Sequence, residues 1–254
     1  MMQASIKKIG NMTFCITPDE ESMAQRAAEV MLEQIKRKSC SLITIATGNT
    51  PTRSYELLVK MIRKQGVDIS KLRIHKLDEW YGIPMDHPST CEAYLQDKIV
   101  KPMEISKDRY YSIQSQPDDP HEACRQMANR LREDGPIDLC ILGLGANGHL
   151  GLNEPADAVM ADTHCCELTP SSRQHTMLQD EKTTVDKGLT TGMGEILAAK
   201  QILFLVSGKK KAPLMNTFLS RKVTTQYPAS FLWLHPSVTC ICDAEAATEI
   251  MDKL

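Results

Sequence analysis

The chain has 254 residues, of which 42% are hydrophobic and 24% are charged, and its formal net charge is -2 at pH 7. This length suits one large α/β domain spanning 1–254, and the nearly balanced charge argues against broad attraction to nucleic acid or to an anionic membrane. The nine cysteines include no C-x-x-C pair, and we find no secretory leader and no apolar window long enough to span a bilayer. We therefore expect reduced cysteines and a cytoplasmic protein.

Strand-like and helix-like patterns alternate along the chain, which predicts a doubly wound, mostly parallel sheet with helices on both faces, a three-layer Rossmann-like α/β fold. The segment 17–20 (TPDE) predicts the start of the first helix, with Thr17 as the capping residue, and that helix runs to about Arg37. Further strands are expected at 42–46, 72–77, 137–142, 202–206 and 238–242. Further helices are expected at 51–63 and at 89–100. Another begins at 119, another follows the strand 202–206 and ends at 219, and a short one lies at the C-terminus.

The strand at 42–46 is followed by the polar turn 47–51 (TGNTP) and then by a helix. Free backbone N–H groups and the positive end of a helix dipole make such a turn a natural anion site. The hydroxyls of Thr47 and Thr50 could add donors to a phosphate. Simple N-capping by Thr50 is the alternative, and the turn alone does not outweigh it.

Two carboxylates, Asp78 and Glu79, stand beside Trp80 at the end of the strand 72–77. They indicate either an ordinary loop start or a base whose pKa is tuned by partial burial. Side chains alternate across an extended chain, so we expect only one of the two carboxylates to face a substrate.

A glycine-rich segment follows the apolar run 137–142. Its glycines match G-x-G-x-x-G, the fingerprint of a dinucleotide-binding turn, at Gly143, Gly145 and Gly148. We reject that assignment because Gly151 and Pro155 interrupt the segment, and no helical repeat follows the third glycine.

The same segment carries one histidine, His149, and one glutamate, Glu154, five residues apart. A buried histidine satisfied by the backbone is the alternative interpretation. An active-site role is favoured, because ligands of α/β sheets bind at the carboxyl ends of the strands. The strand 202–206 likewise ends in a basic turn, where Lys211 could act as a point-charge partner for phosphate.

Several short segments stand in a characteristic order and spacing: 46–51 (ATGNTP), 77–80 (LDEW), 86–88 (DHP), 145–149 (GANGH) and 153–155 (NEP). With them the chain resembles the amino-sugar-6-phosphate deaminase/isomerases, the glucosamine-6-phosphate deaminase family, from roughly Thr13 to Ala244. The segments 91–95 (CEAYL), 151–155 (GLNEP) and 228–235 (PASFLWLH) are more similar to the galactosamine-6-phosphate branch.

The resemblance implies an enzyme that needs no metal and no organic cofactor and that converts a 2-amino-2-deoxyhexose 6-phosphate to a 6-phosphoketose and ammonia. It implies that His149 opens the sugar ring, that Asp78 removes the C2 proton, and that Glu154 orients His149. Histidine suits ring opening because it both accepts and donates a proton near neutrality. The residues that the resemblance assigns to substrate and phosphate binding are Thr47, Gly48, Asn49, Thr50, Gly143 and Lys211.

The chain departs from the family pattern at several places, two of which concern the candidate site. Many glucosamine enzymes carry aspartate at the position of Asn147, where an amide can still orient the imidazole but cannot stabilise its cation by charge. A phosphate-binding arginine of those enzymes falls near Leu178, and Arg173 is the nearest basic replacement. Whether Arg173 takes that role is left open.

Two other functions compete with the deaminase. A 6-phosphogluconolactonase-type hydrolase needs a base for water but no carboxylate for C–H abstraction, so Asp78 disfavours it. A non-catalytic sugar-phosphate sensor usually carries a DNA-binding module, and we find no basic recognition helix here. We expect a small sugar phosphate as partner, with neither nucleic acid nor membrane. The sequence does not reveal the C4 epimer or the oligomeric state.

Overall fold

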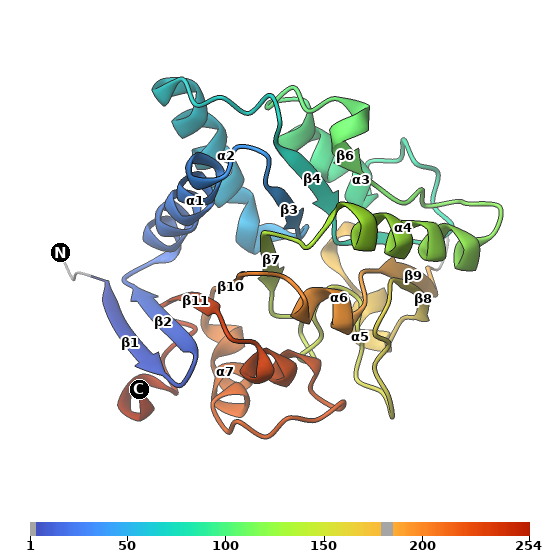
Figure 1. The fold of residues 1–254 in the computed structure, drawn as a ribbon. Helices are drawn as coiled ribbons and strands as arrows, with labels where there is room; N and C mark the ends of the chain where they lie inside the picture. The colour runs from blue at the N-terminus through green and yellow to red at the C-terminus, as the bar shows by residue number, and fades with distance from the viewer. Residues whose placement is uncertain (1–3, 179–184) are drawn as a thin grey trace.

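The computed structural model describes residues 4–178 and 185–254, and an eight-stranded sheet runs through its centre (Figure 1). The strand order is β1-β2-β11-β10-β7-β3-β4-β6. Every neighbouring pair is parallel except β1 and β2, which form an antiparallel hairpin. The strands are β1 (Ser5–Ile9), β2 (Met12–Thr17), β3 (Leu42–Ile45), β4 (Arg73–Lys76), β6 (Tyr110–Tyr111), β7 (Leu139–Gly143), β10 (Ile202–Val206) and β11 (Val238–Asp243).

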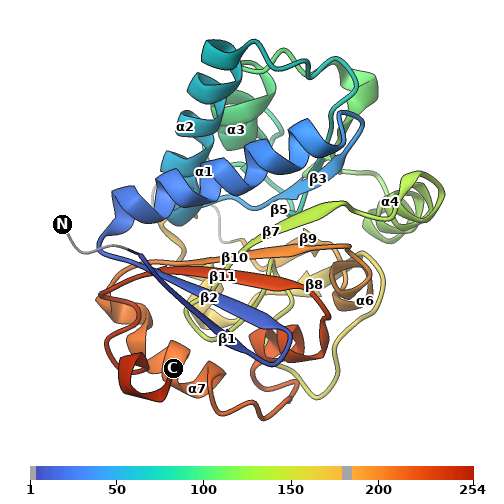
Figure 2. The ribbon, with the colours of Figure 1, turned by 60° about the vertical axis from the view of Figure 1, so that its left-hand side comes forward.

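Helices cover both faces of this sheet, as Figure 2 shows for α1, α2 and α3 on one side and α6 and α7 on the other. The predicted mostly parallel, three-layer fold is therefore confirmed. The helices are α1 (Glu20–Arg37), α2 (Asn49–Gln65), α3 (Cys91–Leu95), α4 (Pro120–Asp134), α5 (Pro170–Arg173), α6 (Met193–Leu197) and α7 (Ala212–Phe218).

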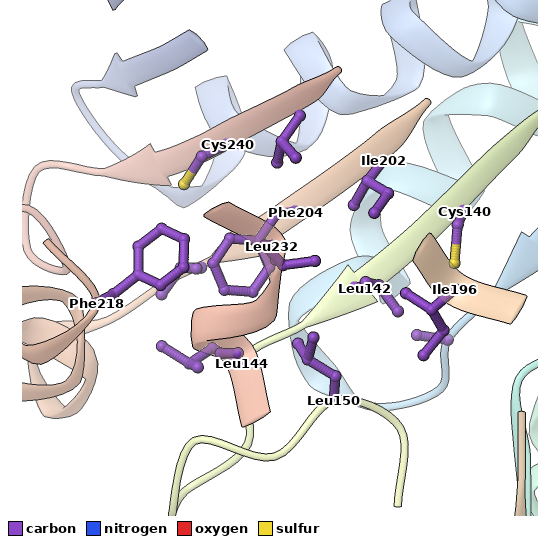
Figure 3. Packing of buried hydrophobic residues seen from close by; sticks show 14 of the residues in the cluster. Cys140, Leu142, Leu144, Leu150, Ile196, Ile202, Phe204, Phe218, Leu232 and Cys240 are labelled. Carbon is purple, nitrogen blue, oxygen red and sulfur yellow. The ribbon is translucent and has the colours of Figure 1, made fainter. Parts of the chain in front are cut away.

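The central strands carry apolar side chains on both faces, because both faces are covered. Leu142 and Phe204 pack with α6 and α7 in one cluster, part of which is drawn in Figure 3. Their neighbours along the same strands, Ile141 and Leu205, point to the opposite face and pack with α1 and α2 in the other cluster. Burial of all five residues of β10 explains why this strand is a continuous apolar run in the sequence.

Two predicted details are wrong, and a third, the helix at 89–100, is right in extent but only partly α-helical. The cap of α1 is Asp19, whose carboxylate accepts a hydrogen bond from the backbone N–H of Ser22 at 2.7 Å, whereas Thr17 ends β2. The expected helix 89–100 is the short α3, which continues as a π-helical turn over Gln96–Val100. The C-terminal helix is reduced to turns and a 3-10 turn at Met251–Lys253.

A second sheet was not predicted. It has three antiparallel strands in the order β5-β9-β8: β5 (Asp78–Trp80), β9 (Lys187–Thr190) and β8 (His164–Glu167). Because β5 follows β4 after one residue, this small sheet begins at the carboxyl end of a central strand. It extends the rim of the main sheet at the place where the polar segments gather.

Candidate active site

The four segments singled out in the sequence follow β3, β4, β7 and β10, and these are four adjacent strands in the order β10-β7-β3-β4. Ligands of open α/β sheets bind beyond the carboxyl ends of such strands. A cavity of about 260 Å³ lies there. The candidate residues that line it are Thr47, Gly48, Asn49, Thr50, Asp78, Gly143, His149 and Lys211.

The turn after β3 lines the cavity. Gly48, with a φ of +111°, caps α2 without any side-chain hydrogen bond, so the first N–H groups of α2 lack an internal acceptor. The Thr50 hydroxyl does not cap the helix but lies 3.2 Å from the hydroxyl of Ser207, at the end of β10. Simple capping by Thr50 is thereby ruled out, and the turn keeps the features of an anion site.

Lys211 lies beside this turn, after β10. Its ammonium donates a hydrogen bond to the Leu144 carbonyl oxygen at 2.6 Å. Burial lowers the pKa of Lys211. An anion bound at the turn would offset that effect, because an opposite charge nearby favours the ammonium form.

Asp78 also lines the cavity, half-buried at the start of β5. Burial, and then the negative charge of Glu79, raise its pKa to about 6, against smaller opposing effects of His149, Cys91 and Lys76. The carboxylate is therefore a stronger base than an exposed aspartate and is still mostly ionised at pH 7.

The adjacent Glu79 points away from the cavity, as alternation along the strand predicts. It is buried and forms an ion pair of 2.7 Å with Lys76. Its carboxylate also accepts hydrogen bonds from the backbone N–H groups of Trp80, Cys91 and Glu92. These bonds tie the start of α3 to β5 and so hold the segment that carries Asp78.

His149 is backed by Glu154. The imidazole Nδ1 lies 3.3 Å from the Glu154 carboxylate, and the two side chains are 15% and 6% exposed. Burial alone would raise the pKa of Glu154, but the hydrogen bond and positive charge of His149, with hydrogen bonds from Ser172 and Asn147, lower it to about 2. An ionised Glu154 accepts a hydrogen bond from Nδ1–H and thereby leaves Nε2 free to exchange protons.

Asn147 supports this pair through two hydrogen bonds. Its amide nitrogen donates to Glu154 at 2.8 Å, and its amide oxygen accepts the backbone N–H of His149 at 3.2 Å. The Thr169 hydroxyl donates to the same carboxylate oxygen at 3.1 Å. Asn147 therefore acts on the imidazole through Glu154 and through the backbone of His149.

The glycines of this segment are required by close packing. A side chain at Gly145 would collide with the His149 ring, and Gly148 has a φ of +88° with Tyr227 packed against it. Turns, not a helix, follow Gly148. The absence of a helix in this stretch agrees with the rejection of the dinucleotide-binding assignment.

Arg173 is directed elsewhere. Its guanidinium pairs with Asp186 at 2.8 Å and donates to the Leu168 carbonyl oxygen at 3.0 Å. Leu178, at the position of the family's arginine, is buried in an apolar cluster. Neither residue is among those that line the cavity.

Two residues at the site were not foreseen. The Cys91 thiol, at the start of α3, lies 3.6 Å from Asp78 Oδ1 and 3.5 Å from the Thr47 hydroxyl. His175 lines the cavity from the turn after α5. Cys91 belongs to the segment 91–95 that separates the two family branches, which is the only signal that could have pointed to it.

All nine cysteines lie in the described part of the chain, and each is a free thiol. Within residues 4–178 and 185–254, no cluster of three or more His, Cys, Asp or Glu side chains is arranged to hold a metal ion. None of the helices in those ranges combines the length and apolar character that crossing a membrane requires.

Comparison with known proteins agrees with this geometry. The family described as glucosamine-6-phosphate isomerases/6-phosphogluconolactonase matches residues 18–240. An Escherichia coli (strain K12) protein assigned as a deaminase, AgaI, is 41% identical over 220 residues, covering 87% of each chain. The glucosamine-6-phosphate deaminase of Thermoanaerobacter pseudethanolicus is 35% identical and covers 95% of this chain and 96% of its own.

Solved structures show the same fold. A monomeric glucosamine-6-phosphate deaminase superposes with a TM-score of 0.88 at 31% identity, covering 94% of this chain and 99% of that one. The 6-phosphogluconolactonase of Plasmodium vivax, at 19% identity and a TM-score of 0.74, shares the fold. The chain belongs to the glucosamine-6-phosphate isomerase/6-phosphogluconolactonase family. Within it, this protein is an enzyme of the amino-sugar-phosphate deaminase/isomerase class.

Proposed function

We propose that the enzyme converts galactosamine 6-phosphate to tagatose 6-phosphate and ammonia. The observation that carries this proposal is one cavity lined by an anion-binding turn, Lys211, Asp78 and His149. We choose galactosamine 6-phosphate over its gluco epimer because segments 91–95, 151–155 and 228–235 are similar to the galactosamine-6-phosphate branch.

His149 would move a proton from the anomeric hydroxyl to the ring oxygen and so open the ring. Glu154 stabilises the imidazolium formed on the way, because its own pKa is held near 2 and it stays ionised. Asn147 and Thr169 hold that carboxylate in place.

Asp78 would then take the C2 proton of the open aldehyde, which the neighbouring carbonyl acidifies, and return a proton at C1. The pair of electrons left at C2 moves to the carbonyl oxygen, which becomes the C1 hydroxyl by gaining the proton that the amino nitrogen loses. Proton return at C1 then leaves an imine at C2. Addition of water to that imine releases ammonia and the 6-phosphoketose. Fixed geometry between base and substrate supplies much of the rate in such steps.

The test is ammonia release from galactosamine 6-phosphate and from glucosamine 6-phosphate, with hydrolysis of 6-phosphogluconolactone as a third assay. We expect ammonia from the galacto compound at the higher kcat/KM and no lactone hydrolysis above background. Lactone hydrolysis without ammonia release would favour the hydrolase. A higher kcat/KM for the gluco compound would overturn the choice of epimer.

A further inference from the structure

The proposed mechanism uses several residues that line the cavity, but it gives no role to His175 and Trp80, which line it as well. Their ring centroids are 5.4 Å apart, with the planes tilted by 45°. Trp80 is 3% exposed and belongs to β5, so it offers His175 a fixed surface to pack against.

The hydrogen bonds of His175 determine which ring nitrogen carries the proton. The backbone N–H of Met177 donates to Nδ1 at 3.3 Å, so Nδ1 is an acceptor. In a neutral imidazole the other nitrogen then bears the hydrogen. His175 therefore presents Nε2–H as a hydrogen-bond donor.

The charge state of His175 suits a neutral partner. Burial, and then the positive charges of His149 and Lys211, lower its pKa. At neutral pH the ring is uncharged, which makes it a weak partner for a phosphate dianion but a suitable donor to a hydroxyl oxygen. Because His149 and Lys211 both act on it, His175 lies within electrostatic reach of the imidazole assigned to ring opening and of the ammonium assigned to the phosphate.

The position of His175 corresponds to the middle of the sugar, around C4. In an amino-hexose 6-phosphate the reacting carbons are C1 and C2, and the phosphate is on C6. The oxygen on C5 is the ring oxygen assigned to His149. C4 lies midway between C2 and C6, and its hydroxyl is the group whose configuration distinguishes the galacto from the gluco sugar.

We propose that His175, held against Trp80, donates a hydrogen bond to the C4 hydroxyl and determines which epimer the enzyme prefers. This inference rests on the proposed function. A site that hydrogen-bonds one substrate hydroxyl discriminates strongly, because the wrong isomer leaves a buried polar group unpaired. Trp80 supports this role, since its buried indole N–H finds no acceptor in the described ranges.

The experiment compares kcat/KM for galactosamine 6-phosphate and glucosamine 6-phosphate in the wild type, His175→Ala and His175→Asn. For His175→Ala we expect kcat/KM to fall about tenfold or more for the preferred epimer and less than about threefold for the other. His175→Asn keeps a neutral donor and should recover part of the preference. His121→Ala, an exposed histidine on α4, is the matched control and should change neither value.

Inhibition by inorganic phosphate separates hydroxyl recognition from phosphate binding. We expect the inhibition constant of inorganic phosphate to stay within about twofold in His175→Ala, because a neutral imidazole contributes little to anion binding. An equal loss for both epimers, no loss for either, or a large loss of phosphate inhibition would overturn the assignment of His175 alone. A wild-type enzyme that releases ammonia from neither sugar would instead overturn the proposed function and this inference with it.

Discussion

The Cys91 sulfur lies 3.6 Å from Oδ1 of Asp78. Burial, with the charges of Glu79 and Asp78, raises the pKa of this thiol. The thiol therefore stays protonated and donates a hydrogen bond to the Asp78 carboxylate. The same sulfur lies 3.5 Å from the hydroxyl of Thr47. Cys91 therefore links the proposed base to the anion-binding turn.

Cys91→Ala should raise the pKa of Asp78, because it removes a hydrogen bond that favours the ionised carboxylate. The acidic limb of the kcat/KM profile should move to higher pH, by about half a pH unit, and Cys91→Ser should restore it. Cys40→Ala, an exposed cysteine, is the control. A profile that shifts equally in the Ala and Ser variants, or in neither, would exclude a role of the thiol as donor.

The raised pKa of Asp78 predicts opposite effects on activity and stability. Since the base must be ionised, kcat/KM should fall as the pH drops through about 6. A carboxyl whose pKa is higher in the folded state binds more protons there between about pH 4 and 6, so its contribution to stability is lost as the pH rises through that window.

Asp78→Asn removes this titration. The variant should be more stable than the wild type at pH 8 by about 1–3 kcal/mol, and the difference should shrink towards pH 4. Urea unfolding at both pH values measures it. Equal free energies of unfolding for the wild type and the variant at pH 8 would mean that the pKa of Asp78 is not raised in the folded protein.

Lys211→Ala should raise the Michaelis constant about tenfold or more and weaken inhibition by inorganic phosphate, because the ammonium lies beside the anion-binding turn. The value of kcat should change less. Lys210→Ala, an exposed neighbour in the same basic turn, serves as the matched control. If both variants behave alike, the effect comes from general positive charge and not from Lys211 in the cavity.

Lys76→Met should destabilise the fold by about 3–5 kcal/mol, because Glu79 would be left as a buried charge without its partner. The Lys76 ammonium also lies 3.1 Å from Glu92, so the loss affects both β5 and α3. The midpoint of urea unfolding measures the change, with the exposed Lys60→Met as control. A loss below about 1 kcal/mol would show that the ion pair does not hold this segment.

The sequence was sufficient for β3, β4, β7, β10 and β11 of the central sheet, because strands covered on both faces are apolar runs, as in β10. It was insufficient for the sheet β5-β9-β8, which pairs three short strands far apart in the chain. It also missed β2, the two-residue strand β6 and β1, whose mostly exposed side chains show no buried face. The cap of α1 was misplaced because Thr17 and Asp19 are both capping residue types, and only the backbone of β2 distinguishes them.

For the site, strand ends were the useful signal. Thr47, Asp78, His149 and Lys211 each follow a predicted strand, and parallel strands end at one edge of a sheet, so their gathering around one cavity could be expected. His175 lines the cavity, and Cys91 lies behind Asp78 and Thr47, and both come from segments that follow no predicted strand. Their contacts with Asp78 and Trp80 depend on tertiary packing, which no local pattern encodes.

The most direct test of the account follows the C2 proton of galactosamine 6-phosphate in deuterated solvent. The wild type should exchange this proton, while Asp78→Asn should bind the substrate with a similar dissociation constant and show no exchange. Exchange at the wild-type rate in Asp78→Asn would contradict the account, because another group would then be the base.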